Sequence, residues 1–403
     1  RLRIPGLTAD FTDSSALVAA GLRKPQCAGV LALTDNDHIN LMVAITCKLL
    51  APDVTVISRA ESHDAQANIA SFGTDYIINP FDTFAERFAM MFTSPSMYLV
   101  YEWMTSLQQA PLTEFAAPPR GTWVICGYGR FGKAMQKSLS FKGIKTIIVE
   151  LDPEGTNAPK GTIRGRGTEA ITLHEAGIEH ADGLIAGTDD DANNLSIIMT
   201  ALHLNEDLFT VARQNVSSND AIFAAADIDI TMLPGRLIGK QIIDMLTTPM
   251  LTDFLRLAIQ QNEEWANILV SRVAGILADR PPDSWAITIS TKQSPAITQL
   301  LRKGVAVTVK DLLTDPREIS TPLPCVALYI RHHNHQELLL PDDDTVLQIG
   351  DRLLLCGHES AEKHMRWTAR NPHALGYICT RCDRPSGSLW RWLSARRNNQ
   401  TGI

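Results

Sequence analysis

The sequence predicts an α/β protein with two doubly wound parallel-sheet units, the first truncated at its start, and a small C-terminal β-rich α+β lobe. The first observation behind this prediction is a duplication. Residues 29–95 align with residues 183–249 without a gap and share 18 identities in 67 positions, where average composition gives about 4 by chance. The second is the alternation of short apolar runs with helical stretches, and the third is a change to short strands after about residue 280.

The second copy contains a complete unit. Runs rich in β-branched and aromatic residues are expected to be its strands, at 122–126, 145–149, near 163, 183–187 and 208–212. The first copy lacks the beginning of this pattern, because residue 1 aligns after the second strand. We therefore expect about fifty further residues upstream in a longer natural protein, roughly one βαβ unit with its helices.

A glycine-rich loop follows the first strand of the second copy. Gly127, Gly129 and Gly132 have the spacing of a dinucleotide fingerprint between a strand and a helix, where pyrophosphate can rest on the helix N-terminus. Glu150 closes the next strand, 18 residues after Gly132, and its carboxylate would accept hydrogen bonds from a ribose diol. The pattern favours a nucleotide site in a Rossmann-like sheet over a purely structural turn. Glu150 disfavours only the 2′-phosphate of NADP.

Further candidate ligand residues lie at the ends of later strands. Arg166 would stack on the adenine base or equally stay on the surface. Thr188 and Asp189 follow the fourth strand, although acids there, and at 34–37 in the first copy, more often cap helices. The predicted cofactor-binding residues are Gly127, Tyr128, Gly129, Arg130, Phe131, Gly132, Glu150, Leu151, Arg166, Thr188, Asp189 and Arg213. The cofactor would be NAD(H) or ADP/ATP, and no catalytic or metal-binding residue is predicted.

Both copies end in two helices joined at a Thr-x-Pro turn. These helices are expected at about 83–92 and 96–108, and again at about 237–246 and 250–262. The second helix of the first copy carries an apolar stripe of Met97, Val100, Tyr101 and Met104, which fits either an ordinary core or a protein–protein contact. Strands of the C-terminal lobe are expected at 285–289, 305–309, 325–330 and 352–356.

Composition narrows the class of protein. A net charge of -7 argues against a general nucleic-acid binder. Seven scattered cysteines indicate cytosolic thiols rather than a disulfide framework, and no apolar run approaches the ~18 residues of a membrane helix. Two metal patterns are weak: Cys379 and Cys382 form a single thiol pair, and the histidines at 332–335 fit a hairpin tip better than a metal site. The arginine- and tryptophan-containing tail fits a solvated segment or a contact with an anionic membrane.

Together these elements resemble RCK or KTN domains of TrkA-N/TrkA-C type, the cytosolic regulatory domains of bacterial potassium channels and transporters. The resemblance rests on the loop at 127–132, the motifs at 32–37 and 186–191 with Arg59 and Arg213, and the paired end helices. Residues 341–357 are similar to the family's small C-terminal lobe. The second copy departs from the family pattern at Arg166, where the family carries an acid that the first copy keeps as Asp10.

The resemblance implies a gating domain of a potassium channel that binds an adenine (di)nucleotide and controls potassium flux by conformational change. It implies a transmembrane potassium pore upstream in the same polypeptide, a homotetramer forming a ring of eight units, and a place at the cytoplasmic face of the inner membrane, with no nucleic acid partner. The expected domains are a first N-lobe with crossover helices (1–110), a linker (111–120), a second N-lobe with crossover helices (121–262), a TrkA-C-like lobe (263–360) and a basic tail (361–403).

Two other functions stay open. The chain could regulate a Kef-type potassium/proton antiporter or a Trk-type uptake system, which are members of the same regulatory class. An NAD-dependent dehydrogenase is the more distant alternative, because Rossmann-like sheets serve both functions. A dehydrogenase needs a proton-transfer group beside the nicotinamide, and the C-terminal region offers no convincing His–acid pair apart from the hairpin histidines.

Overall fold

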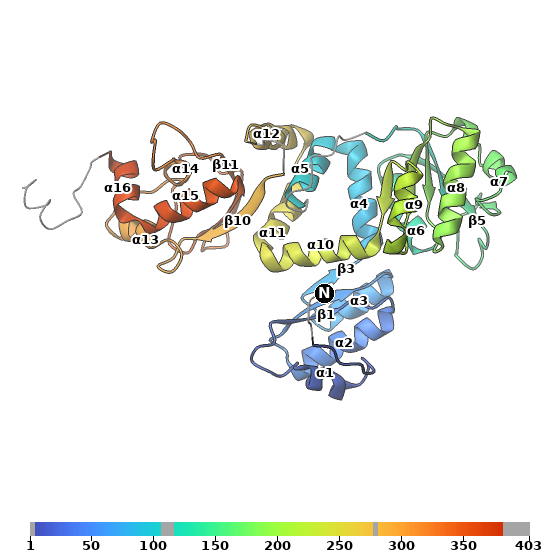
Figure 1. Ribbon diagram of the computed structural model, residues 1–403, viewed down its shortest axis with the longest axis horizontal. Helices are drawn as coiled ribbons and strands as arrows, with labels where there is room; N and C mark the ends of the chain where they lie inside the picture. The colour runs from blue at the N-terminus through green and yellow to red at the C-terminus, as the bar shows by residue number, and fades with distance from the viewer. Residues whose placement is uncertain (1–4, 106–116, 277–280, 382–403) are drawn as a thin grey trace, which may run out of the picture. The chain divides into compact units, whose positions relative to one another are not determined.

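The computed structural model describes residues 5–105, 117–276 and 281–381. Contacts divide the chain into two compact units, residues 1–93 with 116–243 and residues 94–115 with 244–403. Each unit is described here by itself (Figure 1). The grouping by contacts separates the two end helices of each copy, so the domain boundaries expected from the sequence stay a prediction.

The second copy forms a six-stranded parallel sheet in the order β6-β5-β4-β7-β8-β9. Its strands are β4 (Thr122–Cys126), β5 (Lys145–Glu150), β6 (Ile163–Arg164), β7 (Gly183–Ala186), β8 (Phe209–Arg213) and β9 (Ile230–Met232). The order confirms the predicted doubly wound, Rossmann-like fold. It reverses between β4 and β7, which is the point where open α/β sheets bind ligands outside the carboxyl ends of the strands.

Helices connect these strands. They are α6 (Arg130–Phe141), α7 (Ala170–Glu175), α8 (Asp191–Leu204), α9 (Asp220–Ala225) and the short 3-10 turns η1 (Ile178–His180) and η2 (Ser217–Asn219). The central strands are buried on both faces, as their unbroken apolar runs require. Trp123, Val124, Ile125 and Ile185 have no exposed surface.

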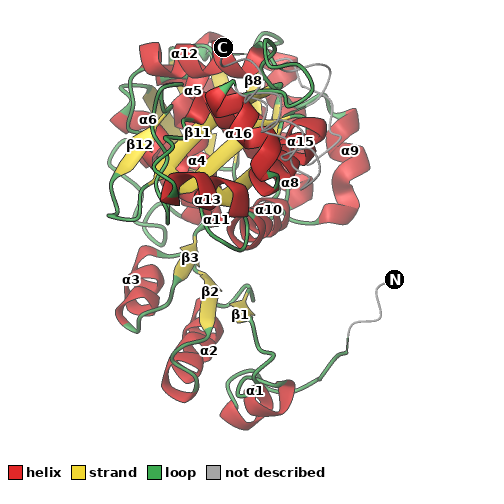
Figure 2. Cartoon of the chain, turned by 90° about the vertical axis from the view of Figure 1, so that its left-hand side faces the viewer, coloured by secondary structure: helices red, strands yellow, loops and turns green. Residues whose placement is uncertain are grey.

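The first copy supplies a three-stranded parallel sheet in the order β1-β2-β3. It consists of β1 (Gly29–Ala32), β2 (Thr55–Arg59) and β3 (Tyr76–Ile78), with helices α1 (Ser14–Ala20), α2 (Asp37–Leu50) and α3 (His63–Ser71) (Figure 2). These strands are the counterparts of β7, β8 and β9. Val43, Ala44 and Cys47 of α2 join Val56 of β2 in one buried cluster.

Aromatic side chains join the two copies within the first unit. Helix α4 (Pro80–Thr93), the first end helix of the first copy, packs against α6 of the second. Phe88 and Phe92 lie edge-on to Trp123 of β4, with ring centroids 5.3 and 5.7 Å apart. Phe81 and Phe84 contact Phe131 at 5.9 and 5.7 Å. The corresponding helix of the second copy is α10 (Pro234–Thr247).

The remaining end helices pack together in the second unit. Helix α5 (Pro95–Thr105) contacts α11 (Pro249–Ala258) and α12 (Glu263–Ala274). Met97, Val100 and Met104 are buried and Tyr101 is half-buried, so three of the four residues of the apolar stripe belong to the core of this unit. The helix expected at 250–262 was predicted too long. It ends at Ala258, and the Asn262 side chain caps α12 by accepting a hydrogen bond from Trp265 N.

The C-terminal lobe is an antiparallel sheet with helices, as predicted. The sheet has the order β10-β13-β11-β12. Its elements are β10 (Asp283–Thr288), α13 (Pro295–Arg302), α14 (Val309–Leu313), β11 (Cys325–Arg331), β12 (Glu337–Leu339), β13 (Arg352–Gly357), α15 (Glu359–Arg370) and α16 (Pro372–Thr380). The strand expected at 305–309 was wrong. Thr308 and Asp311 form a capping box that begins α14 there, and Val307 and Val309 are buried.

Candidate functional site

A cavity of about 490 Å³ lies at the carboxyl ends of β4, β5 and β7. This is the place where the strand order reverses. Nine of the twelve predicted ligand residues line it: Gly127, Gly129, Arg130, Glu150, Leu151, Arg166, Thr188, Asp189 and Arg213. Their contact with a ligand stays a prediction, but the fold does bring them to one place.

The glycines of the loop have different steric roles. Gly127 has φ +95°, a conformation that side chains rarely adopt. A Cβ atom on Gly132 would lie 2.0 Å from the carbonyl oxygen of Gly127, so Gly132 allows the helix to approach the strand. A Cβ atom on Gly129 would meet no atom within 4 Å. It begins α6 without any capping side chain, which leaves that helix start suited to an anion.

Glu150 holds the loop in place. Its carboxylate accepts hydrogen bonds from the backbone N–H groups of Tyr128 at 2.5 Å and Asp152 at 3.0 Å. The loop after β4 is thereby fixed to the end of β5. Each carboxylate oxygen keeps a second lone pair, so a ribose hydroxyl could still donate to it.

The loop after β7 is held by a buried amide. Asn194 Oδ1 accepts hydrogen bonds from Thr188 N and Thr188 Oγ1, at 2.9 and 2.7 Å. Asn194 Nδ2 donates to the carbonyl of Arg213 at 2.7 Å. Asp190, rather than Asp189, caps α8 through Asn193 N. Asp189 is therefore free of the capping role and lies exposed at the cavity.

Two arginines stand at one end of the cavity. Arg213 lies over the Phe81 ring at 4.8 Å and Arg130 over the same ring at 5.9 Å. Burial, followed by the charge of Arg130, lowers the pKa of Arg213 to about 10, while Asp189 opposes the shift. Arg213 remains a cation at neutral pH. This end of the cavity is therefore suited to the negative charge of a phosphate.

Three of the predicted residues do not line the cavity. Tyr128 is buried and its hydroxyl contacts Gln136 Oε1 at 3.1 Å, Phe131 packs among aromatic rings, and Gly132 lies beneath the loop. Nine residues that line the cavity were not among the predicted ligand residues: Cys126, Val149, Thr156, Gly165, Gly167, Thr168, Gly187, Asn193 and Ile197. Gly165, Gly167 and Thr168 flank the predicted residue Arg166, so the sequence did point to this segment, whereas the loop carrying Thr156 has no motif.

The weaker patterns can be placed as well. The histidines at 332–335 lie in the hairpin between β11 and β12, as predicted. In the ranges that the structure describes, no cluster of three His, Cys, Asp or Glu side chains could hold a metal. Most of residues 361–381 of the expected basic tail belong to α15 and α16, whereas Cys382 and the residues after it lie outside those ranges. Among the described helices, none has the length and apolar character that crossing a membrane requires.

A larger cavity of about 850 Å³ lies in the second unit. It is bordered by Arg272 and Lys310 and by the acids at 342–344. Its lining carries both positive and negative side chains, and within the described ranges no glycine-rich loop at the end of a parallel strand borders it. Its larger volume alone does not make it the better nucleotide site.

Comparison with known proteins agrees with this geometry. The family model described as the TrkA-N domain matches residues 1–80 and residues 123–234. The chain carries two TrkA-N domains in tandem. The glycine loop and the cavity belong to the second TrkA-N domain, and the three-stranded sheet belongs to the first.

Relatives are known among potassium transport proteins. The chain is 28% identical over 148 residues to Potassium channel protein 1 of Methanocaldococcus jannaschii, covering 35% of this chain and 44% of that protein. It is 30% identical over 137 residues to the Trk system potassium uptake protein TrkA homolog of Pyrococcus horikoshii, covering 31% and 60%. The matches thus span less than two thirds of either relative.

A solved structure shares the fold. The crystal structure of the GsuK RCK domain superposes with a TM-score of 0.50 at 18% sequence identity, covering 90% of this chain and 84% of that one. The likeness therefore extends past the two TrkA-N domains to the C-terminal lobe. It confirms the RCK-type fold expected from the sequence.

Proposed function

We propose that the second TrkA-N domain binds an adenine nucleotide, NAD(H) or ADP/ATP, and regulates potassium flux through a conformational change. The observation that carries the proposal is the cavity at 127–132, where a glycine loop, an uncapped helix start and the Glu150 carboxylate converge. Arg130 and Arg213 provide positive charge at the same cavity.

The residues of the cavity favour binding over catalysis. Its lining side chains offer carboxylates, hydroxyls and guanidinium groups, and no histidine is among the described residues that border it. Hydride transfer to a substrate would need a proton-transfer group beside the nicotinamide. Regulation needs only that the ligand bind one arrangement of the domains more tightly than another. The two TrkA-N domains of this chain are the parts whose relative arrangement the ligand would change.

The expected partner is a transmembrane potassium pore, encoded upstream in the same polypeptide. The name of the Methanocaldococcus relative, a potassium channel protein, supports this choice. Four chains would form a ring of eight units at the cytoplasmic face of the inner membrane. The Pyrococcus relative, named as a Trk uptake protein, supports the alternative in which the domains regulate a separate transport subunit.

Differential affinity supplies the energy for gating. A ligand that binds the open arrangement about 100-fold more tightly provides roughly 2.7 kcal/mol per site, and four sites in one ring provide about 11 kcal/mol. That is enough for a two-state gate, and it requires no bond chemistry.

Gly129 allows a sharp test of the site. Its backbone lies at φ -72° and ψ -164°, which any residue adopts, and a Cβ atom there meets nothing within 4 Å. We expect Gly129→Ala to weaken nucleotide binding about tenfold and Gly129→Asp to weaken it more than about 100-fold, by blocking and repelling the pyrophosphate. Both variants should unfold at the wild-type temperature. Calorimetry with NAD, NADH, ADP and ATP measures the affinities.

Gly239→Asp is the matched control. It adds the same charge in α10, again with no atom within 4 Å of the new Cβ and outside the cavity. It should leave nucleotide affinity unchanged. If none of the four nucleotides binds the wild-type protein, the proposed ligand is wrong. If nucleotide binds but potassium flux through the full-length protein in liposomes ignores it, the gating role is wrong.

A further inference from the structure

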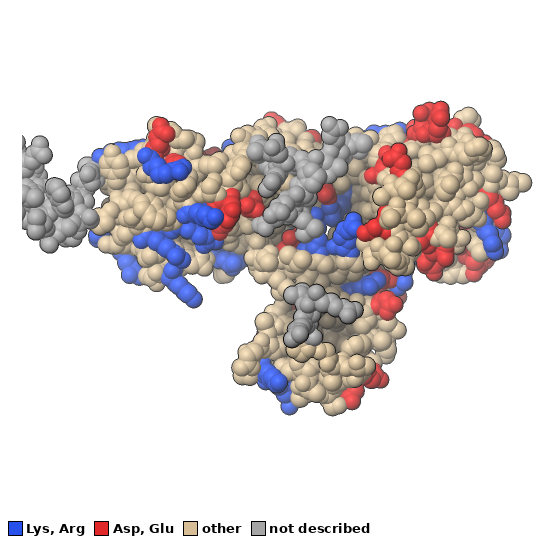
Figure 3. Space-filling view, in the orientation of Figure 1, with Lys and Arg blue, Asp and Glu red and all other residues tan. Residues whose placement is uncertain are grey.

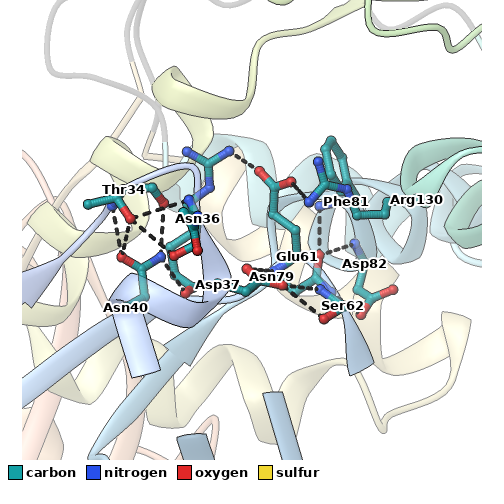
Figure 4. Close-up of polar contacts among 11 residues, drawn as sticks. Thr34, Asn36, Asp37, Asn40, Glu61, Ser62, Asn79, Phe81, Asp82 and Arg130 are labelled. Carbon is teal, nitrogen blue, oxygen red and sulfur yellow. Dashed lines mark hydrogen bonds and ion pairs between the residues drawn. The ribbon is translucent and has the colours of Figure 1, made fainter. Parts of the chain in front are cut away.

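A buried glutamate connects the first TrkA-N domain to the glycine loop of the second. Glu61 follows β2, and only 5% of its surface is exposed. Its carboxylate forms ion pairs with Arg59 Nη2 and, at 2.6 Å, with Arg130 Nη1 (Figure 4). The backbone N–H of Glu61 donates to Asp37 Oδ1 at 2.9 Å. We call the two ion pairs of the Glu61 carboxylate, with Arg59 and with Arg130, the Glu61 bridge.

Arg130 faces two environments. It is the first residue of α6, it lines the nucleotide cavity, and half of its side chain is exposed. Glu61 engages its Nη1 atom. A phosphate in the cavity can reach the remaining N–H groups, but it must then share the positive charge of Arg130 with Glu61 or displace the carboxylate.

The second copy shows that the local framework does not require this acid. The position equivalent to Glu61 is Asn215. In both copies the backbone N–H at this position donates to the aspartate in the first turn of the preceding helix, Asp37 or Asp191. The Asn215 amide serves the framework by donating to Asp191 Oδ1 at 2.9 Å. The Glu61 carboxylate instead contacts two arginines, Arg59 of its own domain and Arg130 of the second domain, and only the contact with Arg130 joins the two domains.

We propose that Glu61 and the bound nucleotide compete for Arg130, so that nucleotide binding weakens the Glu61 bridge and its contact between the two TrkA-N domains. The proposal rests on the proposed nucleotide site and adds to it the residue through which ligand is coupled to the neighbouring domain. Nucleotide affinity is then lower than the cavity alone would give, because part of the binding energy replaces the Glu61 contact.

The surrounding charges make this exchange feasible. When Arg130 moves to a phosphate, Glu61 keeps its ion pair with Arg59, so no buried carboxylate is left alone. Arg213 and Arg59 add positive charge near Arg130, while Asp35, Asp37, Asp189 and Asp191 oppose it. Glu61 is the carboxylate in direct contact with Arg130 among the ion pairs of the described residues.

A double-mutant cycle tests the competition. ADP and NAD are titrated by calorimetry into the wild-type protein, Glu61→Gln, Arg130→Gln and the double variant. We expect Glu61→Gln to tighten binding about tenfold, because Arg130 loses its competitor, and Arg130→Gln to weaken it about tenfold. In the Arg130→Gln background, the Glu61 substitution should change affinity less than about twofold.

Two further variants make the outcome specific. Asp35→Asn removes one exposed acid near the same arginines without removing a contact to Arg130, and it should change affinity less than about twofold. Glu61→Asp keeps a carboxylate for Arg59 but is one methylene too short for both contacts. It should tighten binding as Glu61→Gln does, and it replaces Glu61→Gln if that variant fails to fold.

Several results would overturn the competition while leaving the nucleotide site in place. The first is nucleotide binding that is unchanged or weaker in both Glu61 variants than in the wild type. The second is an effect of Glu61→Gln that is as large in the Arg130→Gln background as in the wild-type background. The third is a gain in affinity from Asp35→Asn equal to that from Glu61→Gln. A wild-type protein that binds neither ADP nor NAD would overturn the proposed function and the competition together. Hydrogen exchange provides an independent check, since Arg130→Gln without ligand should speed exchange at 61–65.

Discussion

The two copies share a framework at the carboxyl edge of their sheets and differ in the side chains that the framework presents. In both, a buried asparagine, Asn40 or Asn194, joins the loop after one strand to the carbonyl at the end of the next. The first copy then presents Glu61 to its neighbour, where the second has Asn215. The backbone framework is thus retained, while the side chains differ: Glu61 of the first copy contacts the neighbouring domain, and residues of the second copy line a cavity.

A second difference lies in the following helix. Phe81 of the first copy is buried, contacts Phe131, and carries the guanidinium groups of Arg130 and Arg213 over its ring. Its counterpart in the second copy is Gly235. One copy therefore supplies an aromatic and acidic surface to the other copy's loop, and the reverse contact is not made by these positions. On the face drawn in Figure 3, acidic side chains predominate over the second TrkA-N domain.

The largest expected effect comes from breaking the shared framework. Asn40 and Asn194 have no exposed surface, and each side chain makes four hydrogen bonds. Alanine at either position leaves backbone groups unpaired, so we expect each variant to lose about 2–3 kcal/mol of unfolding free energy. Urea unfolding followed by circular dichroism measures this loss.

The same pair of variants separates the two copies by function. Asn194→Ala should also weaken nucleotide binding, because Thr188 and Arg213 line the cavity. Asn40→Ala should leave affinity near the wild-type value. Equal losses of affinity in both variants would contradict the assignment of the ligand to the second copy.

Much of this framework was predictable from the sequence. The apolar runs predicted β4 to β8, because buried parallel strands need unbroken apolar residues, and the glycine spacing predicted the loop. The alternation of apolar residues at 305–309 predicted a strand that the structure does not have. The capping box between Thr308 and Asp311 forms locally there and outweighs strand propensity.

The contact between domains was not predictable. Glu61 belongs to no motif, and its partner Arg130 lies far along the chain, so only the fold brings them together. Phe131 was predicted to contact ligand because it belongs to the fingerprint, yet its ring turns to Phe81 and Phe84. Sequence patterns specify backbone geometry well. The direction in which a side chain of the loop points depends on the side chains of the neighbouring domain that pack against it.

A smaller effect is expected from the aspartate anchors. Asp191 accepts hydrogen bonds from the backbone N–H groups of Asn215 and Val216 and from the amides of Asn215 and Asn219. Burial acts to raise the pKa of Asp191, but these hydrogen bonds outweigh it and hold the pKa below its ordinary value. We expect Asp191→Asn to cost about 1–2 kcal/mol at pH 7.

The pH dependence of that loss follows from the direction of the shift. A lowered pKa means that the ionised carboxylate stabilises the fold above its unfolded value of about 3.9, and that this contribution is lost as pH falls through the folded pKa. The difference between wild type and Asp191→Asn should therefore shrink below about pH 4. Urea unfolding at pH 7, 4 and 3 measures it. A difference that stays constant with pH would show that the charge of Asp191 is not what the loop requires.

The smallest expected effect concerns two equivalent aspartates. Both accept a hydrogen bond from the backbone of the neighbouring strand, but their second partners differ. Asp75 and Asp229 each accept a hydrogen bond at 2.7 Å from the backbone N–H of the neighbouring strand. The second partner of Asp75 is Lys48, at 2.7 Å, whereas that of Asp229 is the Thr210 hydroxyl, at 2.8 Å. An ion pair and a hydrogen bond from an uncharged donor can thus be compared at one position of a repeated fold.

Salt distinguishes the two partners. The Asp75 side chain is 37% exposed, so screening by solvent limits the ion pair, and Lys48→Met should cost only about 0.5 kcal/mol at low salt. In 1 M sodium chloride, where the screening length is about 3 Å, that cost should largely disappear. Thr210→Val removes an uncharged donor at a buried site, so its cost of about 1 kcal/mol should be the same at both salt concentrations. Urea unfolding at 50 mM and 1 M salt gives the four values. If Lys48→Met were as insensitive to salt as Thr210→Val, the Lys48 contact would act through packing of its alkyl chain, and the two copies would differ less in their electrostatics than their sequences suggest.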